Sequence, residues 1–275
     1  MADTPVILQD ILTILNQTAP SALAASWDNV GLMVGDPFQE VTGILVGLDP
    51  TSGLIDEAIA HGANLVINHH PLIFTPLQSI RTDQPIGRCI AEAIKNRIAI
   101  VACHTNLDVV HNGVNHVLAR QIGLQDTTPL APTSATDSQI GFGSVGSLPA
   151  PLAAGDFFGH LCQVLGLTVL PICGVVPSHI QKVAVCGGSG SDFAEAAYLG
   201  GAQVYITGEV KHNVARWAEE SGFCIIDAGH FATENLVVDS LVTTLAKSLR
   251  EGAIELKVQA SNLQNNPFFY YMKSK

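Results

Sequence analysis

Two short strings of the same layout carry the residues best suited to chemistry. His104-Thr-Asn-Leu-Asp108 and His230-Phe-Ala-Thr-Glu234 each place an imidazole four residues before a carboxylate. Each string follows an apolar run that is typical of a buried strand, and a third such run leads into His69 and His70. Imidazole nitrogen and carboxylate oxygen are common ligands of divalent metals. Three strand ends that present such ligands therefore predict a metal-binding protein.

The adjacent histidines favour two metal ions over one. Successive side chains of an extended chain point to opposite faces, so a single ion would struggle to use both His69 and His70. Two neighbouring ions could use both, and a carboxylate can bridge ions that lie about 3.5–4 Å apart. Asp108 and Glu234 are the candidate bridges. The ligand types suit Zn, Fe, Mn, Ni or Co, and the sequence does not choose among them.

The elements that must position these strings follow a β-α-β rhythm. Short apolar runs alternate with segments of helical periodicity, which predicts parallel sheets covered by helices. Open parallel sheets bind ligands beyond the carboxyl ends of their strands, where all three His-bearing strings lie. We expect strands at 43–49, 64–68, 98–103, 183–186, 204–207, 223–226 and 254–258, and helices at 50–60, 86–96, 113–122, 192–199, 213–220 and 233–249.

A change of composition divides the chain. Thr, Ser, Pro, Gly and Ala dominate residues 126–154 with little periodicity, as expected of a domain junction. We therefore predict two similar α/β domains with mainly parallel sheets and a metal cleft between them. The first covers residues 1–126 and the second residues 127–234, and the segment from about 235 to 275 is a candidate to return to the first domain.

The two halves also resemble each other. Sliding residues 44–68 by 139 positions places them on residues 183–207 without a gap, and pairs such as Val46/Val185 and Gly62/Gly201 coincide. Shared β-α-β patterning can produce such likeness by chance. A genuine duplication would make two similar sheets aim their strand ends into one cleft.

Other polar residues give weaker signals. Gly187-Gly188-Ser189-Gly190 before a helix could cradle a phosphate, but it lacks the Lys of a P-loop and a tight turn explains it equally well. His212 could line the cleft or serve a helix start. We expect Cys103 to be a buried structural thiol. Single histidines usually make ordinary polar contacts, which is our interpretation of His61, His111, His116, His160 and His179.

Composition excludes several classes of protein. The chain is 47% hydrophobic and only 13% charged, so it can bury a large core, and its net charge of −11 disfavours broad nucleic-acid binding. The most apolar stretch, 161–176, is too short and too interrupted by Gly and Pro to span a membrane. The N-terminus does not read as a secretion signal, and the six cysteines form no C-x-x-C pair. We expect free thiols and a cytoplasmic protein.

The motifs, taken in order, resemble those of a known family. They are Trp27-Asp-Asn-Val-Gly-Leu32, Asn68-His-His-Pro71, His104-Thr-Asn-Leu-Asp108 with Gly113-Val-Asn115, Gly208-Glu-Val-Lys-His212 and Gly229-His-Phe-Ala-Thr-Glu234. The combination is highly specific, spans roughly residues 10–257, and is similar to the Nif-three-like dinuclear metal-centre family, also labelled GTP cyclohydrolase I type 2 homologues. The resemblance implies a toroidal hexamer with metals between two α/β domains.

The resemblance also implies roles for single residues. His69, His70, Asp108, His230 and Glu234 would be the metal ligands, with Glu234 as the bridge. His104 matches a position near the metals. Family members often carry His or Tyr after the last histidine, whereas this chain has Phe231, which argues against a proton relay there. Longer members contain an inserted middle domain, for which residues 126–154 are too few.

Two classes of function fit these features. The first is a metal-dependent hydrolase that acts on a small molecule such as a nucleotide, a phosphoester or a cyclic amide, with His104 or His212 as the acid–base candidate. GTP ring opening is implied by the family label alone. The second is a metal-handling or regulatory protein without turnover. The apolar composition and the aromatic tail, residues 267–271, favour a homo-oligomer, and the resemblance implies a hexamer.

Overall fold

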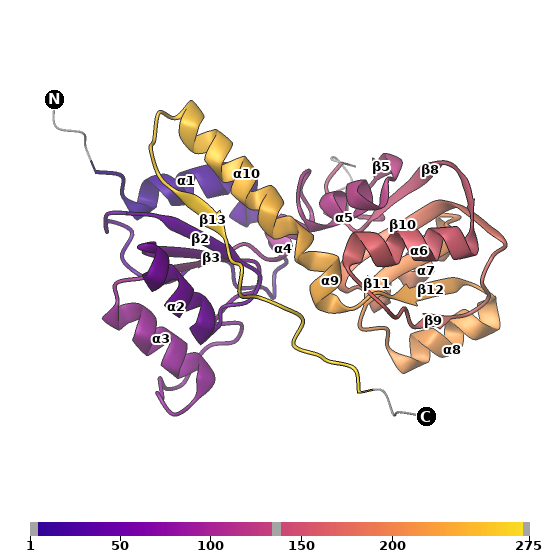
Figure 1. Ribbon diagram of the computed structural model, residues 1–275, viewed down its shortest axis with the longest axis horizontal. Helices are drawn as coiled ribbons and strands as arrows, with labels where there is room; N and C mark the ends of the chain where they lie inside the picture. Colours follow the sequence, from indigo (N-terminus) through magenta and orange to yellow (C-terminus); the bar gives the residue numbers. More distant parts are fainter. Residues whose placement is uncertain (1–4, 134–138, 272–275) are drawn as a thin grey trace.

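The molecule consists of two halves that lie side by side, each built around its own sheet (Figure 1). The computed structural model describes residues 5–133 and 139–271. The last part of the chain crosses from the second half back to the first, so that the two halves are joined twice.

Five short strands form the sheet of the first half. The order is β1 (Gly31–Val34), β4 (Ala99–Ala102), β3 (Leu65–Asn68), β2 (Ile44–Gly47) and β13 (Val258–Ala260). All neighbours are parallel except β1, which pairs antiparallel with β4. Every residue of β2, β3 and β4 is buried, which explains the continuous apolar runs of the sequence. Because these strands are parallel, the residues that follow them meet at one edge.

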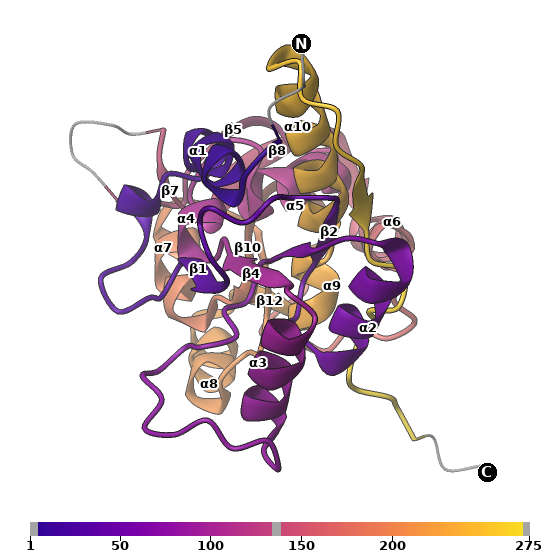
Figure 2. The same ribbon diagram turned by 90° about the vertical axis from the view of Figure 1, so that its left-hand side faces the viewer.

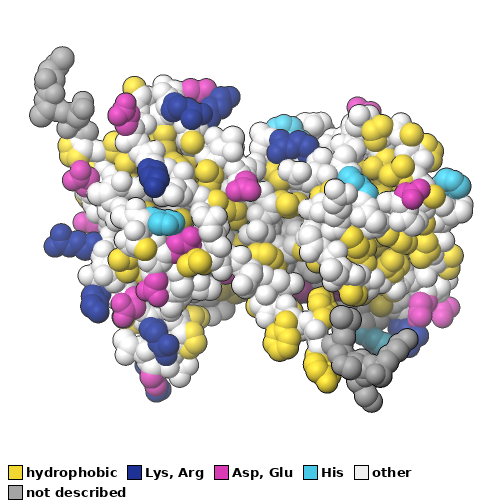
Figure 3. Space-filling view, in the orientation of Figure 1, with side chains coloured by type: hydrophobic (Ala, Val, Ile, Leu, Met, Phe, Trp, Pro, Cys, Tyr) yellow, Lys and Arg dark blue, Asp and Glu magenta, His cyan; other side chains and the backbone are white. Residues whose placement is uncertain are grey.

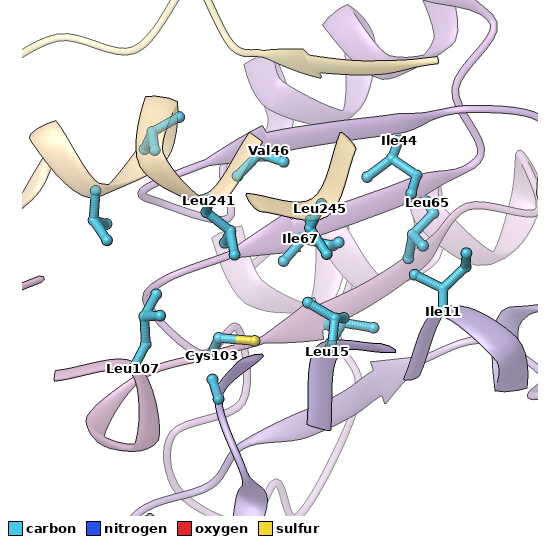
Figure 4. Close-up of a cluster of buried hydrophobic side chains, with 14 of the residues drawn as sticks. Ile11, Leu15, Ile44, Val46, Leu65, Ile67, Cys103, Leu107, Leu241 and Leu245 are labelled. Carbon is cyan, nitrogen blue, oxygen red and sulfur yellow. The ribbon is translucent and has the colours of Figure 1, made fainter. Parts of the chain in front are cut away.

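Helices cover both faces of this sheet (Figure 2). On one face lie α1 (Leu8–Thr18) and α10 (Leu236–Glu251), and on the other α2 (Ser52–His61) and α3 (Pro85–Lys95). Successive strand side chains alternate between the two faces. Leu65 and Ile67 therefore pack against α1 and α10 (Figure 4), whereas Val66 packs against α2 and α3. Burial of each such side chain stabilises the fold by about 1.5–3 kcal/mol.

The second sheet has a parallel centre and antiparallel edges. Its order is β5 (Gln125–Thr128), β8 (Ser144–Ala153), β10 (His179–Ser189), β11 (Val204–Gly208), β12 (Cys224–Asp227) and β9 (Ile172–Cys173). The ladders between β10, β11 and β12 are parallel, and the others are antiparallel. A separate two-stranded sheet joins β6 (Ala131–Pro132) to β7 (Gly141–Phe142).

This sheet is also covered on both faces. One core contains α5 (Val114–Ile122) and α6 (Ala154–Leu165), and the other contains α7 (Ala194–Leu199) and α8 (His212–Ser221). Short helical segments complete the described chain: η1 (Ser21–Leu23), α4 (Thr105–Asp108), η2 (Ser191–Phe193) and α9 (His230–Glu234). The α/β class and the parallel central strands are confirmed.

The described part of residues 126–154, where we expected little regular structure, contributes β5 to β8; the small residues of β8 gave too weak an apolar alternation. Two expectations about element bounds were wrong. The last helix does not begin at Thr233, because the chain is already helical from His230, with a boundary at Asn235. The last strand lies at 258–260, a few residues beyond the expected place. Residues 134–138 of the expected junction lie outside the described residues.

The structural repeat agrees with the sequence offset. In the first half Ile44 pairs with Leu65, and in the second Val183 pairs with Val204, which are the positions 139 residues further on. The connecting segment is helical in both halves. Identical register across a parallel pair is a stronger likeness than shared residue types, so it supports an internal duplication.

The C-terminal segment pairs with the first sheet. Strand β13 adds to β2 in parallel, with Ala260 opposite Val46, and α10 packs in the same core as α1. The division into domains at residue 126 stays a prediction. No helix in the described ranges is long and apolar enough to cross a membrane.

Candidate metal centre

The three histidine-bearing strand ends meet between the two sheets. His69 and His70 directly follow β3, and His104 follows β4 after one residue. His230 begins α9, shortly after β12 of the other sheet. The ring nitrogens Nε2 of His70 and His230 lie 3.2 Å apart, although 160 residues separate them. The structure therefore brings residues of both halves into one cluster.

The spacing of four residues has a local explanation. In each string the strand end is followed by one helical turn, α4 in the first half and α9 in the second. Residues four apart on a helix lie on the same face. Nε2 of His230 accordingly lies 3.0 Å from Oε2 of Glu234. Asp108 ends the corresponding turn in the first half, and its carboxylate also faces the cluster.

Three imidazoles of the cluster are anchored through Nδ1. The anchor is the carbonyl oxygen of Cys103 for His69 (2.9 Å), Asp49 Oδ1 for His70 (2.8 Å) and Glu209 Oε1 for His230 (3.0 Å). An oxygen that accepts from Nδ1–H fixes the tautomer in which Nε2 carries the free lone pair. Metal-ligating histidines usually have such a partner.

The free nitrogens and two carboxylates form two adjoining groups. In one, Nε2 of His69 lies 3.7 Å from Asp108 Oδ1 and 3.6 Å from Glu234 Oε1. In the other, Nε2 atoms of His70 and His230 each lie 3.0 Å from Glu234 Oε2. Each oxygen of Glu234 thus faces a different group. This is the arrangement expected of a carboxylate that bridges two ions.

Two buried atoms at the centre have no hydrogen bond within the described protein. They are His69 Nε2 and Glu234 Oε2, and the ring nitrogens Nε2 of His70 and His230 each lie 3.0 Å from the latter. Burying polar atoms without partners is unfavourable. Two ligands of one tetrahedral ion, at about 2.1 Å each, lie about 3.4 Å apart, which is close to the observed separations. The residues present therefore fit divalent metal ions.

The carboxylates of the cluster favour positive charge on the histidines. Burial would lower the pKa of His70, but its hydrogen bond to Asp49, its contact with Glu234 and the charges of both carboxylates raise it to about 10. Burial would raise the pKa of Glu234, but the charge of His69 and the contacts of His230 hold it well below its usual range. Burial raises the pKa of Asp108 to about 6. Protons on the histidines thus compensate the carboxylates, a role that cations can take over.

His104 lies beside the two groups and is oriented by Asp28. Its ring lies 5.2 Å from that of His69, and its Nδ1 lies 2.8 Å from Asp28 Oδ1. Thr105 also donates its N–H and its hydroxyl to this carboxylate. Burial would raise the pKa of Asp28, but these hydrogen bonds and the charge of His104 hold it well below its usual range. Asp28 is therefore ionised and can only accept, so Nδ1 of His104 donates and Nε2 is left as the reactive nitrogen.

The glycine-rich end of β10 packs against the site, and its N–H groups are not free to bind a phosphate. The N–H groups of Gly187, Gly188 and Gly190 already donate to side chains within the protein. A Cβ at Gly188, where φ is +65°, would lie 2.1 Å from Oε1 of Glu234. Only a glycine lets the backbone approach this carboxylate so closely. The phosphate hypothesis is therefore not supported.

The structure does not bring every candidate to the cluster. His212 is exposed at the start of α8, and no described hydrogen bond connects it to the site, so its proposed acid–base role has no support. Cys103 lies in the apolar core (Figure 4), where burial raises the pKa of its thiol to about 12, as expected of a structural residue. His160 makes an ordinary bond to the carbonyl of Ile122.

Sequence reasoning missed the anchoring residues. The patterns place Asp49 only at the end of an expected strand, and Asp28 and Glu209 only within motifs. Asp49 and Glu209 each follow a parallel strand at the edge where the histidines lie, and this position was a usable signal. Their partners, however, come from other strands, so the pairing itself needed the folded structure.

Comparison with known proteins places this chain in a family of α/β proteins. The family described as Duf34/NIF3 (NGG1p interacting factor 3) matches residues 6–267. The chain belongs to this family, and the resemblance of the motifs is confirmed.

Relatives of known sequence share most of the chain. A "GTP cyclohydrolase 1 type 2 homolog" of Clostridium perfringens is 37% identical over 227 residues, which cover 82% of this chain and 86% of the relative. A protein of the same description from Clostridium acetobutylicum is 32% identical over 261 residues, with 95% and 97% covered.

Solved structures agree with the fold. A NIF3-related protein of Bacillus cereus superposes with a TM-score of 0.93 at 27% identity, covering 98% of this chain and 100% of that one. A Staphylococcus aureus protein gives a TM-score of 0.92 at 30% identity with the same coverage.

Proposed function

We propose that the cluster holds two divalent metal ions per chain and that the protein is a metal-dependent hydrolase of small molecules. His69 and Asp108 would bind one ion, His70 and His230 the other, and Glu234 would bridge the two. The observation that carries the proposal is the position of Glu234, whose two oxygens face two separate groups of ring nitrogens that are anchored for ligation. The donor set of nitrogen and oxygen suits Zn, Fe, Mn, Ni or Co.

Paired ions in such a site supply a water of lowered pKa and stabilise negative charge that develops on a phosphoryl or carbonyl oxygen. The chain itself supplies positioning and proton transfer. Asp49 and Glu209 hold the rings of His70 and His230 in place. His104, oriented by Asp28, presents Nε2 beside the cluster, where it can take or give a proton during hydrolysis. This role is favoured for His104 over His212, which is exposed.

A metal-dependent activity screen tests the hydrolase. Purified protein, loaded with Mn, Zn or Fe in turn, would be assayed on phosphoesters, on cyclic amides and on nucleotides including GTP, the substrate in the relatives' printed name. We expect turnover that requires the metal and is lost in Asp108→Ala. Activity that persists in this variant would identify a contaminant. Full metal loading without any turnover would contradict the hydrolase and favour a metal-handling protein.

A further inference from the structure

We propose that the pocket beside His70 and His230 binds a flat, uncharged heterocyclic ring, and that Phe268 and Tyr270 of the C-terminal segment form its stacking wall. This inference rests on the proposed function, because the ring would be part of the substrate on which the metal centre acts. It assigns a binding role to residues 266–270, which lie outside the metal centre.

The pocket connects the metal centre with the C-terminal segment. It has a volume of about 560 Å³, within the range of small-molecule sites, and both His70 and His230 line it. Phe231 contributes a further aromatic side chain, and Phe268 and Tyr270 lie on the side formed by the C-terminal segment. A ring held between these side chains would therefore lie next to the proposed metal ligands.

The C-terminal segment is fixed to the first half before it reaches the pocket. The side chain of Gln264 bonds the N–H of Leu48 and the carbonyl of Asp49, at the end of β2. Glu57 accepts from the N–H of Asn262 at 2.9 Å. From there the segment runs across toward the second half (Figure 1), and its hydrophobic side chains stand out at the lower edge of the molecule (Figure 3).

The aromatic residues of this segment alternate in their environment. Phe268 and Tyr270 line the pocket, whereas Phe269 and Tyr271 do not and are 89% and 86% exposed. Alternate side chains of an extended chain point to opposite sides. The pocket-facing pair is still 76% and 63% exposed, so both rings are free to contact a ligand. Aromatic side chains of this kind stack on any flat ring, whatever its exact identity.

The charges around the pocket disfavour a phosphate-rich ligand. Its described lining contains the carboxylates Asp49, Glu209 and Asp227 and no Lys or Arg. The nearby Lys211 is bound to both oxygens of Asp192. Asp227 is occupied by backbone N–H groups, but Glu209 uses one oxygen for His230 and can accept from a ligand with the other. Ring N–H donors suit this lining, and away from the proposed metal ions it offers no cation to a phosphate.

Calorimetric titration of the full-length, metal-loaded protein tests the inference. The probes are guanosine, adenosine and pterin as uncharged rings, and ribose 5-phosphate as a ligand without a ring. We expect at least one ring to bind with an affinity that changes little between low and high salt. Phe268→Ala and Tyr270→Ala should each weaken ring binding by about fivefold or more, while Phe269→Ala, the matched control, leaves it unchanged. The affinity for ribose 5-phosphate should not change in any of the three variants.

Three results would overturn the inference. They are ring binding that survives both pocket-facing substitutions, binding of none of the three rings, and a change of assembly state in Phe268→Ala that accounts for the loss. The metal centre is tested separately by metal content and by Asp108→Ala, since Asp108 does not line the pocket. If the protein binds its metal normally but Phe268→Ala and Tyr270→Ala leave ring binding unchanged, this inference is wrong and the proposed function still stands. If the protein binds no metal but the same two substitutions weaken ring binding, the proposed function is wrong and the ring-binding pocket is confirmed.

Discussion

At the scale of single residues, the centre depends on which nitrogen each histidine presents. His69, His70 and His230 are all held through Nδ1. The Nε2 atoms of His70 and His230 lie 3.0 Å from a Glu234 oxygen, and that of His69 lies 3.6 Å from the other oxygen. The anchors are a backbone carbonyl and two carboxylates, Asp49 and Glu209. A change in an anchor leaves the ligand atoms present but frees the ring, so its effect on metal affinity separates orientation from ligation.

The anchor of His70 gives the first prediction. Asp49→Asn should weaken metal binding by about 10- to 100-fold, because the ring loses a charged partner at 2.8 Å while all five proposed ligands remain. Competition with a chromophoric chelator measures the affinity. Asp56→Asn, at an exposed carboxylate on α2, is the matched control and should behave as wild type. Equal affinities of the two variants would mean that the contact does not orient a ligand.

Asp28 gives a prediction about pH. The pKa of Asp28 in the folded protein is well below the value of about 3.9 for an unfolded chain. The ionised Asp28 carboxylate therefore stabilises the fold above about pH 4, and this stabilisation is lost as the pH falls toward the lowered pKa. Asp28→Asn should therefore lower the free energy of unfolding by about 1–3 kcal/mol between pH 5 and 8. The difference from wild type should shrink below about pH 4. Urea unfolding at several pH values measures it, and a difference that grows toward low pH would refute this assignment.

At the scale of elements, the site contains the same strand-and-turn arrangement twice, once in each half. A buried strand ends, one helical turn follows, and the turn aligns residues four apart. This regularity, with the buried strands and the edge on which they end, is why the sequence could offer Asp108, His230 and Glu234 as candidate ligands, whereas the complete set of five is what the family resemblance implies. The anchors and the β5–β8 region escaped prediction. They depend on contacts between distant segments or on strands of small residues whose pattern is weak.

The glycine-rich end of β10 offers a prediction at this scale. Gly188→Ala places a methyl group where Glu234 Oε1 lies and adds a residue with a side chain at φ +65°. We expect a loss of bound metal together with a stability loss of about 1 kcal/mol. Gly155→Ala in α6 is the control, because a Cβ there meets open space. It should keep full metal content, as measured by elemental analysis. Normal metal content in Gly188→Ala would show that Glu234 can bind metal from another position.

At the scale of the whole molecule, the two halves are joined by the cluster of histidines and carboxylates and by the returning C-terminal segment. An apolar groove of about 920 Å³ lies on the first half beside α3, and Ile80 and Ile94 on its lining are 59% and 62% exposed. Apolar surface of this kind often becomes buried between subunits. Together with the exposed Phe269 and Tyr271, it supports a homo-oligomer, and the proposal of six subunits rests on the family resemblance.

Light scattering on dilute protein tests the assembly. We expect a mass near six times the 29.0 kDa of one chain. Ile94→Glu should lower this mass if the groove is an interface, because a charge would have to be buried without a partner. A mass near that of one chain contradicts the hexamer, and a stable dimer would limit the assembly to a two-fold interface.

The central claim is that Glu234 bridges two ions, and metal content tests it most directly. Elemental analysis of metal-loaded wild type should give two ions per chain, and Glu234→Ala should lose most of both. His69→Ala and His70→Ala, in contrast, should each weaken mainly one site. Two ions per chain in Glu234→Ala, bound as tightly as in wild type, would contradict the account.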